Sequence, residues 1–168
     1  MKLILAYIWR ALPIPKSIQL FIMRFMNDQF LVGVTGVIFN DKNEILLFKH
    51  TYRDVQWSLP GGYLKANEHP REGLEREVYE ESHFKIKAMR YVRSLHDTES
   101  TRLDMCFWCF FSGGEFQASE EVVKYGFFAA DKLPKLIDNQ YAEIKRALEN
   151  KRQYDREHFW RKFLPWRK

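Results

Sequence analysis

The sequence predicts one domain of the α/β class. Three observations support this prediction: runs rich in Val, Ile and Phe that alternate with turn residues, a central acidic segment of helical periodicity, and an amphipathic segment towards the C-terminus. The chain has 168 residues, of which 46% are hydrophobic, and this is enough for a substantial core. We expect an apolar helical extension over residues 1–29, the folded domain over 30–160 and a basic, aromatic tail over 161–168.

The N-terminal extension is apolar and aromatic, and we expect it to form one or two helices. Pro15 interrupts the first apolar run, and Ser17 is a candidate cap for a second helix over residues 18–26. The apolar run at residues 3–9 is too short to cross a bilayer and lacks the flanks of a signal peptide. We expect this extension to dock on the domain. Contact with a membrane surface, or with a second copy of the chain as a homodimer, is the alternative.

The central part of the chain alternates strand and turn signals. Residues 30–39 and 44–49 are expected to pair as a hairpin. The pair Gly61-Gly62 permits backbone conformations that are closed to other residues. The remaining expected elements are a helix over residues 70–82, strands over 85–95, 103–111 and 121–130, and a helix over 139–159.

Charge and cysteine content restrict the partners and the compartment. The net charge of +5 favours anionic partners such as phosphates, nucleic acid or an acidic lipid surface. The two cysteines, Cys106 and Cys109, do not make a disulfide framework, so a reducing compartment, the cytoplasm, is expected. Within a strand their spacing directs the two side chains to opposite faces, which favours core positions over a zinc or redox site.

The acidic helix carries the strongest functional signal. Glu77, Glu80 and Glu81 stand at i, i+3 and i+4, so a helix places them on one face, with Cβ atoms about 5–6 Å apart. Like charges at this spacing destabilise a helix unless other charges compensate them. Arg76 can brace Glu80 one turn on, but one arginine does not neutralise the cluster, so divalent cations are the natural counter-charge. Carboxylate oxygens favour Mg²⁺ or Mn²⁺ over softer metals.

This segment resembles the signature of a known family, the Nudix box. The residues that stand at the spacing of the box are Gly62, Glu68, Arg76, Glu77, Val78, Glu80 and Glu81. The preceding residues 57–61, Trp-Ser-Leu-Pro-Gly, are similar to the usual lead-in of the family, and the resemblance spans about residues 30–136. It implies an α/β/α sandwich around a mixed sheet. It also implies hydrolysis of a nucleoside diphosphate that is linked to another group.

The resemblance implies a divalent-metal site. Glu80 and Glu81 would be metal ligands, helped by the main-chain carbonyl of Gly61. Glu77 would be a ligand or the general base. Some members of the family use a later loop glutamate in either role, and Glu120 is the candidate here.

The same resemblance implies residues that support the metal-binding glutamates. The sequence also departs from the box of the family at two places. Arg76 would orient the glutamates, and Glu68 would support them without touching the metal. The box closes with glycine, whereas this chain has His83, from which we expect an effect on stability rather than on chemistry. Gly73 and Leu74 replace the usual paired alanines. A glycine beside the cluster leaves room either for a metal or phosphate or for a closely packed neighbour.

The sequence therefore predicts metal-dependent hydrolysis of the pyrophosphate bond in a nucleotide, a nucleotide sugar or an ADP-ribose-like substrate. A Nudix-fold module that binds a nucleotide without cleaving it is an alternative, although such modules often lose the glutamates that this chain keeps. Removal of pyrophosphate from RNA 5′ ends is another, and the basic surface permits it. Residues 99–102 show no marker of a substrate subclass. Residues 145–168 are expected to form a solvated helix, with RNA or membrane contact as the alternative.

Overall fold

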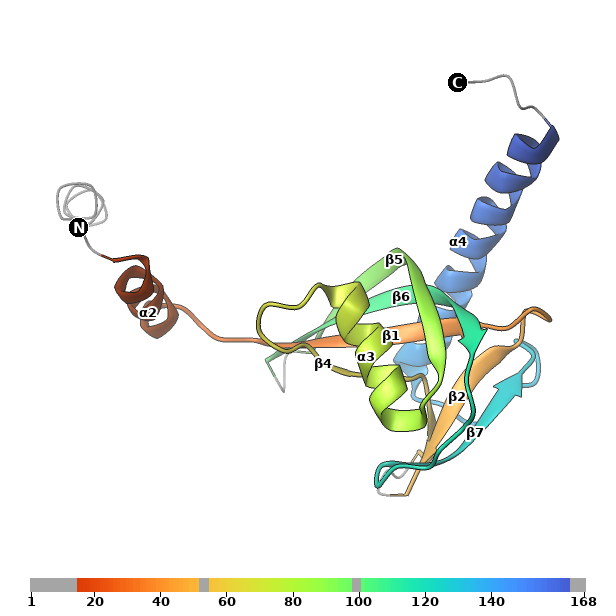
Figure 1. Ribbon diagram of the computed structural model, residues 1–168, viewed down its shortest axis with the longest axis horizontal. Coiled ribbons are helices and arrows are strands. Elements are labelled where there is room, and N and C mark those ends of the chain that lie inside the picture. Colours follow the sequence, from red (N-terminus) through yellow and green to blue (C-terminus); the bar gives the residue numbers. More distant parts are fainter. Residues whose placement is uncertain (1–14, 52–54, 98–100, 164–168) are drawn as a thin grey trace. The chain divides into compact units, whose positions relative to one another are not determined.

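The computed structural model describes residues 15–51, 55–97 and 101–163, with side chains up to residue 158 (Figure 1). By its internal contacts the chain divides into two units, Met1–Phe30 and Leu31–Lys168. The apolar run at residues 3–9 and the last five residues of the expected tail lie outside the described residues. No helix in the described part of the chain is both long and apolar enough to cross a membrane.

The described part of the first unit contains helix α2, Lys16–Met26. The expected helical spacing is confirmed, but Pro15 stands at the N-cap, before the first helical residue, and no side chain caps the helix, so Ser17 lies inside the first turn rather than before it. The fixed φ of proline suits a helix start without a hydroxyl cap. The side-chain amide of Asn27 donates a hydrogen bond from Nδ2 to the main-chain carbonyl of Met23 at 2.6 Å, at the last turn of the helix. No residue of α2 is buried, and the expectation that the extension docks on the domain stays a prediction.

The second unit is built on one mixed, seven-stranded sheet in the order β3-β2-β1-β6-β5, with β4 on β1 and β7 on β2. The strands are β1 (Leu31–Phe39), β2 (Ile45–His50), β3 (Trp57–Ser58), β4 (Gly61–Tyr63), β5 (Lys85–Asp97), β6 (Arg102–Gly113) and β7 (Val122–Phe128). β1 and β6 run parallel over the whole length of β1, and the other pairs are antiparallel.

The expected hairpin between β1 and β2 exists only at its turn. Phe39 and Ile45 form the single paired position, and β2 then pairs with β7 over most of its length. One edge of β1 is filled by β6, and on the other edge β4 pairs with residues 33–35. Because β4 takes the place that β2 leaves, the Gly61-Gly62 pair lies directly beside the central strand.

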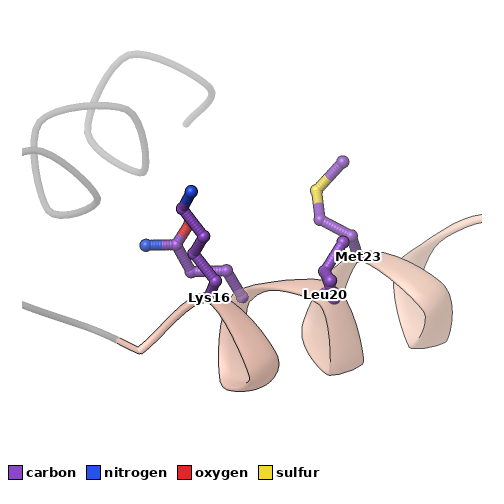
Figure 2. A pocket seen from close by; sticks show the side chains of 4 residues that line it. Lys16, Leu20 and Met23 are labelled. Atoms are coloured by element: carbon purple, nitrogen blue, oxygen red, sulfur yellow. The ribbon is translucent and has the colours of Figure 1, made fainter.

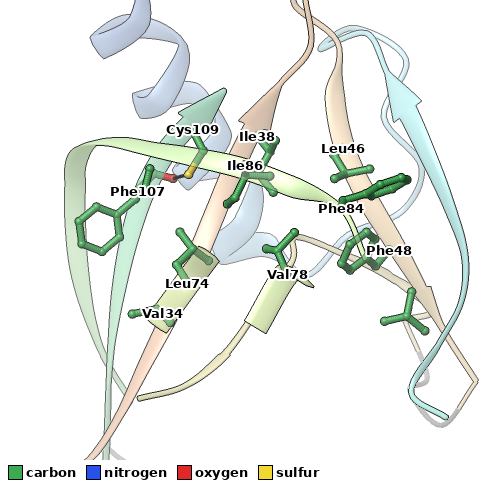
Figure 3. Close-up of a cluster of buried hydrophobic side chains, with 12 residues drawn as sticks. Val34, Ile38, Leu46, Phe48, Leu74, Val78, Phe84, Ile86, Phe107 and Cys109 are labelled. Atoms are coloured by element: carbon green, nitrogen blue, oxygen red, sulfur yellow. Dashed lines mark hydrogen bonds between the residues drawn. The ribbon is translucent and has the colours of Figure 1, made fainter. Parts of the chain in front are cut away.

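Helix α3 (Pro70–Ser82) covers one face of the sheet and helix α4 (Asp138–Phe163) covers the other (Figure 1). Leu74 and Val78 of α3 pack on Val34 and Ile38 of β1 (Figure 3). Ile144 and Ala147 of α4 pack on the opposite face, against a cluster that contains Val37, Phe39 and Trp108. Successive side chains of β1 therefore point alternately into two hydrophobic cores, one on each face of the sheet. The α/β/α sandwich is confirmed. α4 ends beyond the expected residue 159, so the expected boundary at residue 160 falls inside this helix.

The cysteines lie where the strand periodicity predicts. Cys106 belongs to the cluster under α4 and Cys109 to the cluster under α3, and both are free and buried. Burial raises the pKa of both thiols, because the apolar interior disfavours the thiolate. They therefore act as core residues.

Helix α3 has the expected bounds and is capped at both ends. The ring of His69 accepts a hydrogen bond from the Arg71 amide at 3.2 Å, and Pro70 occupies the first turn. His83 ends the helix with a left-handed φ of 58°, and its amide donates to the Tyr79 carbonyl at 2.8 Å. Glycine adopts this conformation without strain, which explains why the family favours it here.

Replacing His83 by Gly is expected to raise the free energy of unfolding by about 0.5–1 kcal/mol. The change removes left-handed strain from a residue with a Cβ. It also removes a buried ring nitrogen, Nδ1, that no described residue contacts by a hydrogen bond. The loss of the ring contact with Tyr79, at 5.1 Å between centroids, offsets part of the gain. Urea unfolding of both proteins measures the difference, and a less stable H83G variant would show that the ring contact outweighs the strain.

Candidate active site

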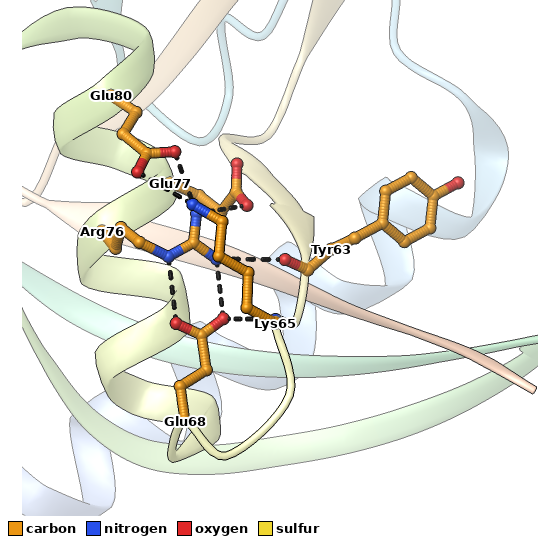
Figure 4. Close-up of polar contacts among 6 residues, drawn as sticks. All are labelled: Tyr63, Lys65, Glu68, Arg76, Glu77 and Glu80. Atoms are coloured by element: carbon orange, nitrogen blue, oxygen red, sulfur yellow. Dashed lines mark hydrogen bonds and ion pairs between the residues drawn. The ribbon is translucent and has the colours of Figure 1, made fainter.

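The functional side chains of α3 are placed by its buried face. Leu74 and Val78 point into the core, which fixes the rotation of the helix and turns the side of Glu77 and Glu80 towards the loop that follows β4 (Figures 3 and 4). That loop, residues 64–69, carries Glu68 to the beginning of the helix. The box residues are thus brought together by one strand, one loop and one helix that are adjacent in the chain.

Arg76 stands at the centre of this arrangement (Figure 4). Its Nε and Nη2 donate to the two oxygens of Glu68 at 3.0 and 2.7 Å. Its Nη1 donates to Glu77 at 2.7 Å and to Glu80 at 2.9 Å. Nη2 also reaches the main-chain oxygen of Tyr63 at 3.1 Å. A guanidinium group has five N–H donors, and here each of them has a partner. The expected contact with Glu80 is therefore one part of a larger network.

Glu68 anchors the arginine. Its carboxylate receives both parallel bonds from Arg76 and a third, at 2.6 Å, from the Lys65 amide. These hydrogen bonds, the one from Arg76 above all, lower the pKa of Glu68 to about 2. A Cβ on Gly73 would lie 2.4 Å from Leu64 Cδ2 and 2.9 Å from a Glu68 oxygen, so this glycine makes room for packed neighbours rather than for a ligand.

The three candidate ligands differ in their surroundings. Glu77 lies against β4, because a Cβ on Gly62 would come within 2.4 Å of its Oε2. Glu80 is half exposed and also bonds Lys65 Nζ at 3.1 Å, which lowers its pKa together with Arg76. Glu81 is buried, with 9% of its surface exposed. All three line one hollow, as the helical spacing predicts.

The same hollow has a second wall from the loop before β7. Its other lining residues are Ser119, Glu120 and Glu121. The candidate Glu120 is therefore brought to the three helix glutamates from a position far along the chain. Gly61 is not among the lining residues, because it lies on β4 opposite Thr35 and faces a neighbouring hollow.

The comparisons with known proteins decide the family. The family model of the NUDIX domain matches residues 29–149. The chain belongs to the NUDIX domain family. A MutT-like protein of Streptomyces ambofaciens is 26% identical over 80% of this chain and 87% of its own length. The NAD-capped RNA hydrolase NudC of Pectobacterium carotovorum subsp. carotovorum is 35% identical over 55% of this chain, which spans only 36% of that relative.

Solved structures agree with this assignment. An ADP-ribose pyrophosphatase from Streptococcus suis shares 30% identity with a TM-score of 0.65, covering 74% of this chain and 93% of that one. A UDP-X diphosphatase shares the fold at 23% identity and a TM-score of 0.67, covering 91% of this chain and 79% of that one. The predicted family, fold class and enzyme class, a Nudix pyrophosphohydrolase, are therefore confirmed.

A divalent cation fits the hollow lined by the glutamates of α3, because of the chemistry of its donor atoms. Glu77, Glu80 and Glu81 offer the hard oxygen ligands that Mg²⁺ and Mn²⁺ prefer. Arg76 holds two of these carboxylates, and the described residues contain no group of three His, Cys, Asp or Glu side chains already arranged around a metal position. Glu80, with 50% of its side chain exposed, can turn from Arg76 to a cation without disturbing the core.

The sequence did not predict a second polar hollow, on the other side of β4. Its lining residues are Val34, Thr35, Leu59, Gly61, Gly62, Tyr63, Arg102, Asp104 and Gln140. Arg102 forms an ion pair with Asp104 at 2.6 Å, and its guanidinium carbon lies 5.6 Å from the centre of the Tyr63 ring. Asp104 is placed by the parallel ladder, which sets it opposite Gly33. The local sequence contains no signal for a parallel pairing across about seventy residues.

The ion pair between Glu68 and Arg76 leads to a prediction about the stability of the fold at acidic pH. Because the pKa of Glu68 is lowered from 4.5 to about 2 on folding, its ion pair stabilises the fold above pH 4.5 and is lost as the pH falls towards 2. A Glu68→Gln variant cannot form this ion pair at any pH. We therefore expect wild type to be the more stable protein at pH 7 and the difference to shrink below pH 4.5. Urea unfolding at pH 7 and pH 3 tests this, and a difference independent of pH would contradict it.

Proposed function

We propose that this Nudix protein is a hydrolase that depends on Mg²⁺ or Mn²⁺ and cleaves the pyrophosphate bond of a nucleoside diphosphate linked to a further group. The observation that carries the proposal is the complete set of box glutamates. Glu77, Glu80 and Glu81 line one hollow together with Glu120 and Glu121, and Arg76 bonds both Glu77 and Glu80. Arg76 forms ion pairs with Glu68, Glu77 and Glu80, and Lys65 forms one with Glu80.

The acidic lining of the hollow favours a cation beside the proposed substrate. A diphosphate is itself an anion, so a hollow lined by carboxylates repels it at close range. A bound divalent cation supplies the opposite charge to both and polarises the phosphoryl oxygens. Glu80 and Glu81 are the proposed ligands. The main-chain carbonyl of Gly61, a residue that lines the neighbouring hollow, is a candidate for a further ligand. Glu120 is a candidate that reaches the hollow from its second wall.

The other residues position the reacting groups. In hydrolysis the oxygen of water bonds to phosphorus, the bridging P–O bond breaks, and the proton from water passes to a base. Glu77 is the proposed base or a further ligand, because it lies between Arg76 and the glycine strand β4. Arg76 holds Glu77 in place, and Glu68 holds Arg76 through two parallel hydrogen bonds.

The named relatives support a nucleotide-linked diphosphate as the substrate class. The Streptococcus protein is named for ADP-ribose, the NudC relatives for NAD-capped RNA, and the fold neighbour for a UDP conjugate. Each of these molecules joins a nucleoside diphosphate to another group. We also propose a cytoplasmic location, which the two free, buried cysteines support because a reducing compartment keeps such thiols unpaired.

A substrate panel tests the proposal. The full chain is incubated with nucleoside triphosphates, ADP-ribose, NAD, a UDP-sugar, and triphosphorylated or NAD-capped RNA, with Mg²⁺ or Mn²⁺, and the released phosphates and nucleotides are measured. We expect hydrolysis of at least one nucleotide-linked diphosphate, abolished by EDTA and restored by excess metal. Tight nucleotide binding without metal-dependent cleavage of any compound would replace the enzyme with a binding module.

A further inference from the structure

The exposed apolar residues of the described chain gather on helix α2. Phe25 is 86% exposed and Phe21 is 71% exposed, the two highest values among the large hydrophobic side chains of the described residues. Ile18 and Met26 are also exposed, at 50% and 62%. Isolated exposed apolar residues are ordinary, but a group of them on one short helix marks a surface that contacts something else.

These side chains form one continuous strip along the helix. At 3.6 residues per turn, residues 18, 21, 22, 25 and 26 fall within about 140° of the helix circumference. Lys16 and Arg24 lie outside this strip. Lys16, Leu20 and Met23 project to a common side of α2, where with Gln19 they line a hollow (Figure 2). The helix therefore has an apolar strip of two phenylalanines and three aliphatic residues, and Lys16 and Arg24 lie on the other side of its circumference.

The charges around this strip have one sign. Residues 1–27 contain four basic residues and no acidic one; Asp28 is the first acidic residue of the chain. Within α2 itself, Lys16 and Arg24 have no acidic neighbour on the helix. A helix with one strip of aromatic and aliphatic residues and with only basic charges on its other side is the pattern of a helix that lies in the plane of an anionic membrane surface.

A second copy of the chain fits this surface less well. Pairing two copies through α2 would place two segments that carry only positive charges side by side. Neither helix offers a carboxylate to pair with them. An anionic lipid surface buries the same strip and pairs the same cations, so it satisfies both observations.

We propose that the apolar strip of α2 binds the surface of an anionic lipid membrane and thereby attaches the hydrolase domain to it. Phe21 and Phe25 enter the boundary between headgroups and acyl chains. Lys16 and Arg24 lie at the level of the phosphates. The membrane contact is independent of the hydrolytic site, because it uses residues of the first unit alone.

Flotation of the full chain with lipid vesicles tests this proposal. Binding is expected to vesicles of phosphatidylcholine mixed with phosphatidylserine, and it is expected to weaken with salt. Replacing both Phe21 and Phe25 by Gln should lower the vesicle affinity by about 100-fold. The matched double change Leu20→Gln and Met23→Gln, on the other side of the helix, should lower it by less than about tenfold.

A variant without the basic residues of α2 separates the electrostatic contribution to vesicle binding from the apolar contribution. Each basic residue near an anionic surface strengthens binding about fivefold, so Lys16→Gln with Arg24→Gln should weaken binding about 25-fold on vesicles with phosphatidylserine, with little change on phosphatidylcholine alone. Thermal unfolding should be the same for all variants, because no residue of α2 is buried.

Three results would overturn the proposal. The first is a parent chain that does not float with either vesicle, and the second is a Phe21/Phe25 variant that floats as well as the parent. The third is a dimer by light scattering that the Phe21 and Phe25 changes convert to a monomer while vesicle binding is absent, which would assign the strip to a second copy of the chain.

Discussion

Replacing Glu80 and Glu81 together by Gln is expected to lower kcat by about 10³-fold, which corresponds to about 4 kcal/mol of transition-state stabilisation. Glutamine keeps the size of each side chain, but its neutral amide oxygen is a poor ligand for a hard divalent cation. Glu81 lies buried at the wall of the hollow, and Glu80 is the carboxylate that is free to turn towards it. The steady-state rate on the best substrate of the panel, measured with saturating Mg²⁺, gives the effect.

The control lies on the same helix. Glu72→Gln makes the same chemical change in the first turn of α3, at an exposed position that does not line the hollow. This variant should keep the wild-type rate. Urea unfolding should show that the double variant is folded, because the two changes leave Leu74 and Val78 in the core and Arg76 paired with Glu68 and Glu77. Undiminished turnover in the double variant would show that neither glutamate holds the metal.

The parts of the fold that follow from neighbouring residues could be predicted from the sequence. The bounds of α3, the left-handed His83 and the opposite burial of Cys106 and Cys109 depend on caps and on strand periodicity. The three glutamates of α3, Glu77, Glu80 and Glu81, line one hollow because of their helical spacing alone. Each of these features is encoded within a few turns or residues of chain.

The features that could not be predicted arise from long-range pairing. The β1–β2 hairpin stops after one pair because β4 occupies the edge of β1, and no local signal marks that competition. The hollow with Asp104 and Arg102 depends on the parallel β1–β6 ladder. Burial on this side of the sheet also raises the pKa of Glu143, in α4, to about 7, a position that the amphipathic pattern did not single out. Residues that are close in space but far apart in the chain thus set the surroundings of the predicted hydrolytic centre.

Arg76 holds Glu68, Glu77 and Glu80 together. Its replacement is expected to have the second large effect on the reaction rate. Arg76→Gln should lower kcat by about 100-fold and the free energy of unfolding by about 1–3 kcal/mol. The change removes five hydrogen bonds, and it leaves Glu68, Glu77 and Glu80 without their shared cation. The stability loss stays below that of a fully buried ion pair, because 21% of the arginine side chain is exposed and solvent screens the charges.

Arg76→Lys separates charge from geometry. Lysine restores the positive charge but not the planar fork that holds Glu68 with two parallel bonds while reaching Glu77 and Glu80. We therefore expect this variant to recover part of the stability and little of the rate. Arg71→Gln, at an exposed position of the same helix, should change neither quantity by more than about 0.5 kcal/mol. If Arg76→Lys restored the full rate, a positive charge alone would be sufficient, and the orientation of the glutamates by the guanidinium group would have no part in catalysis.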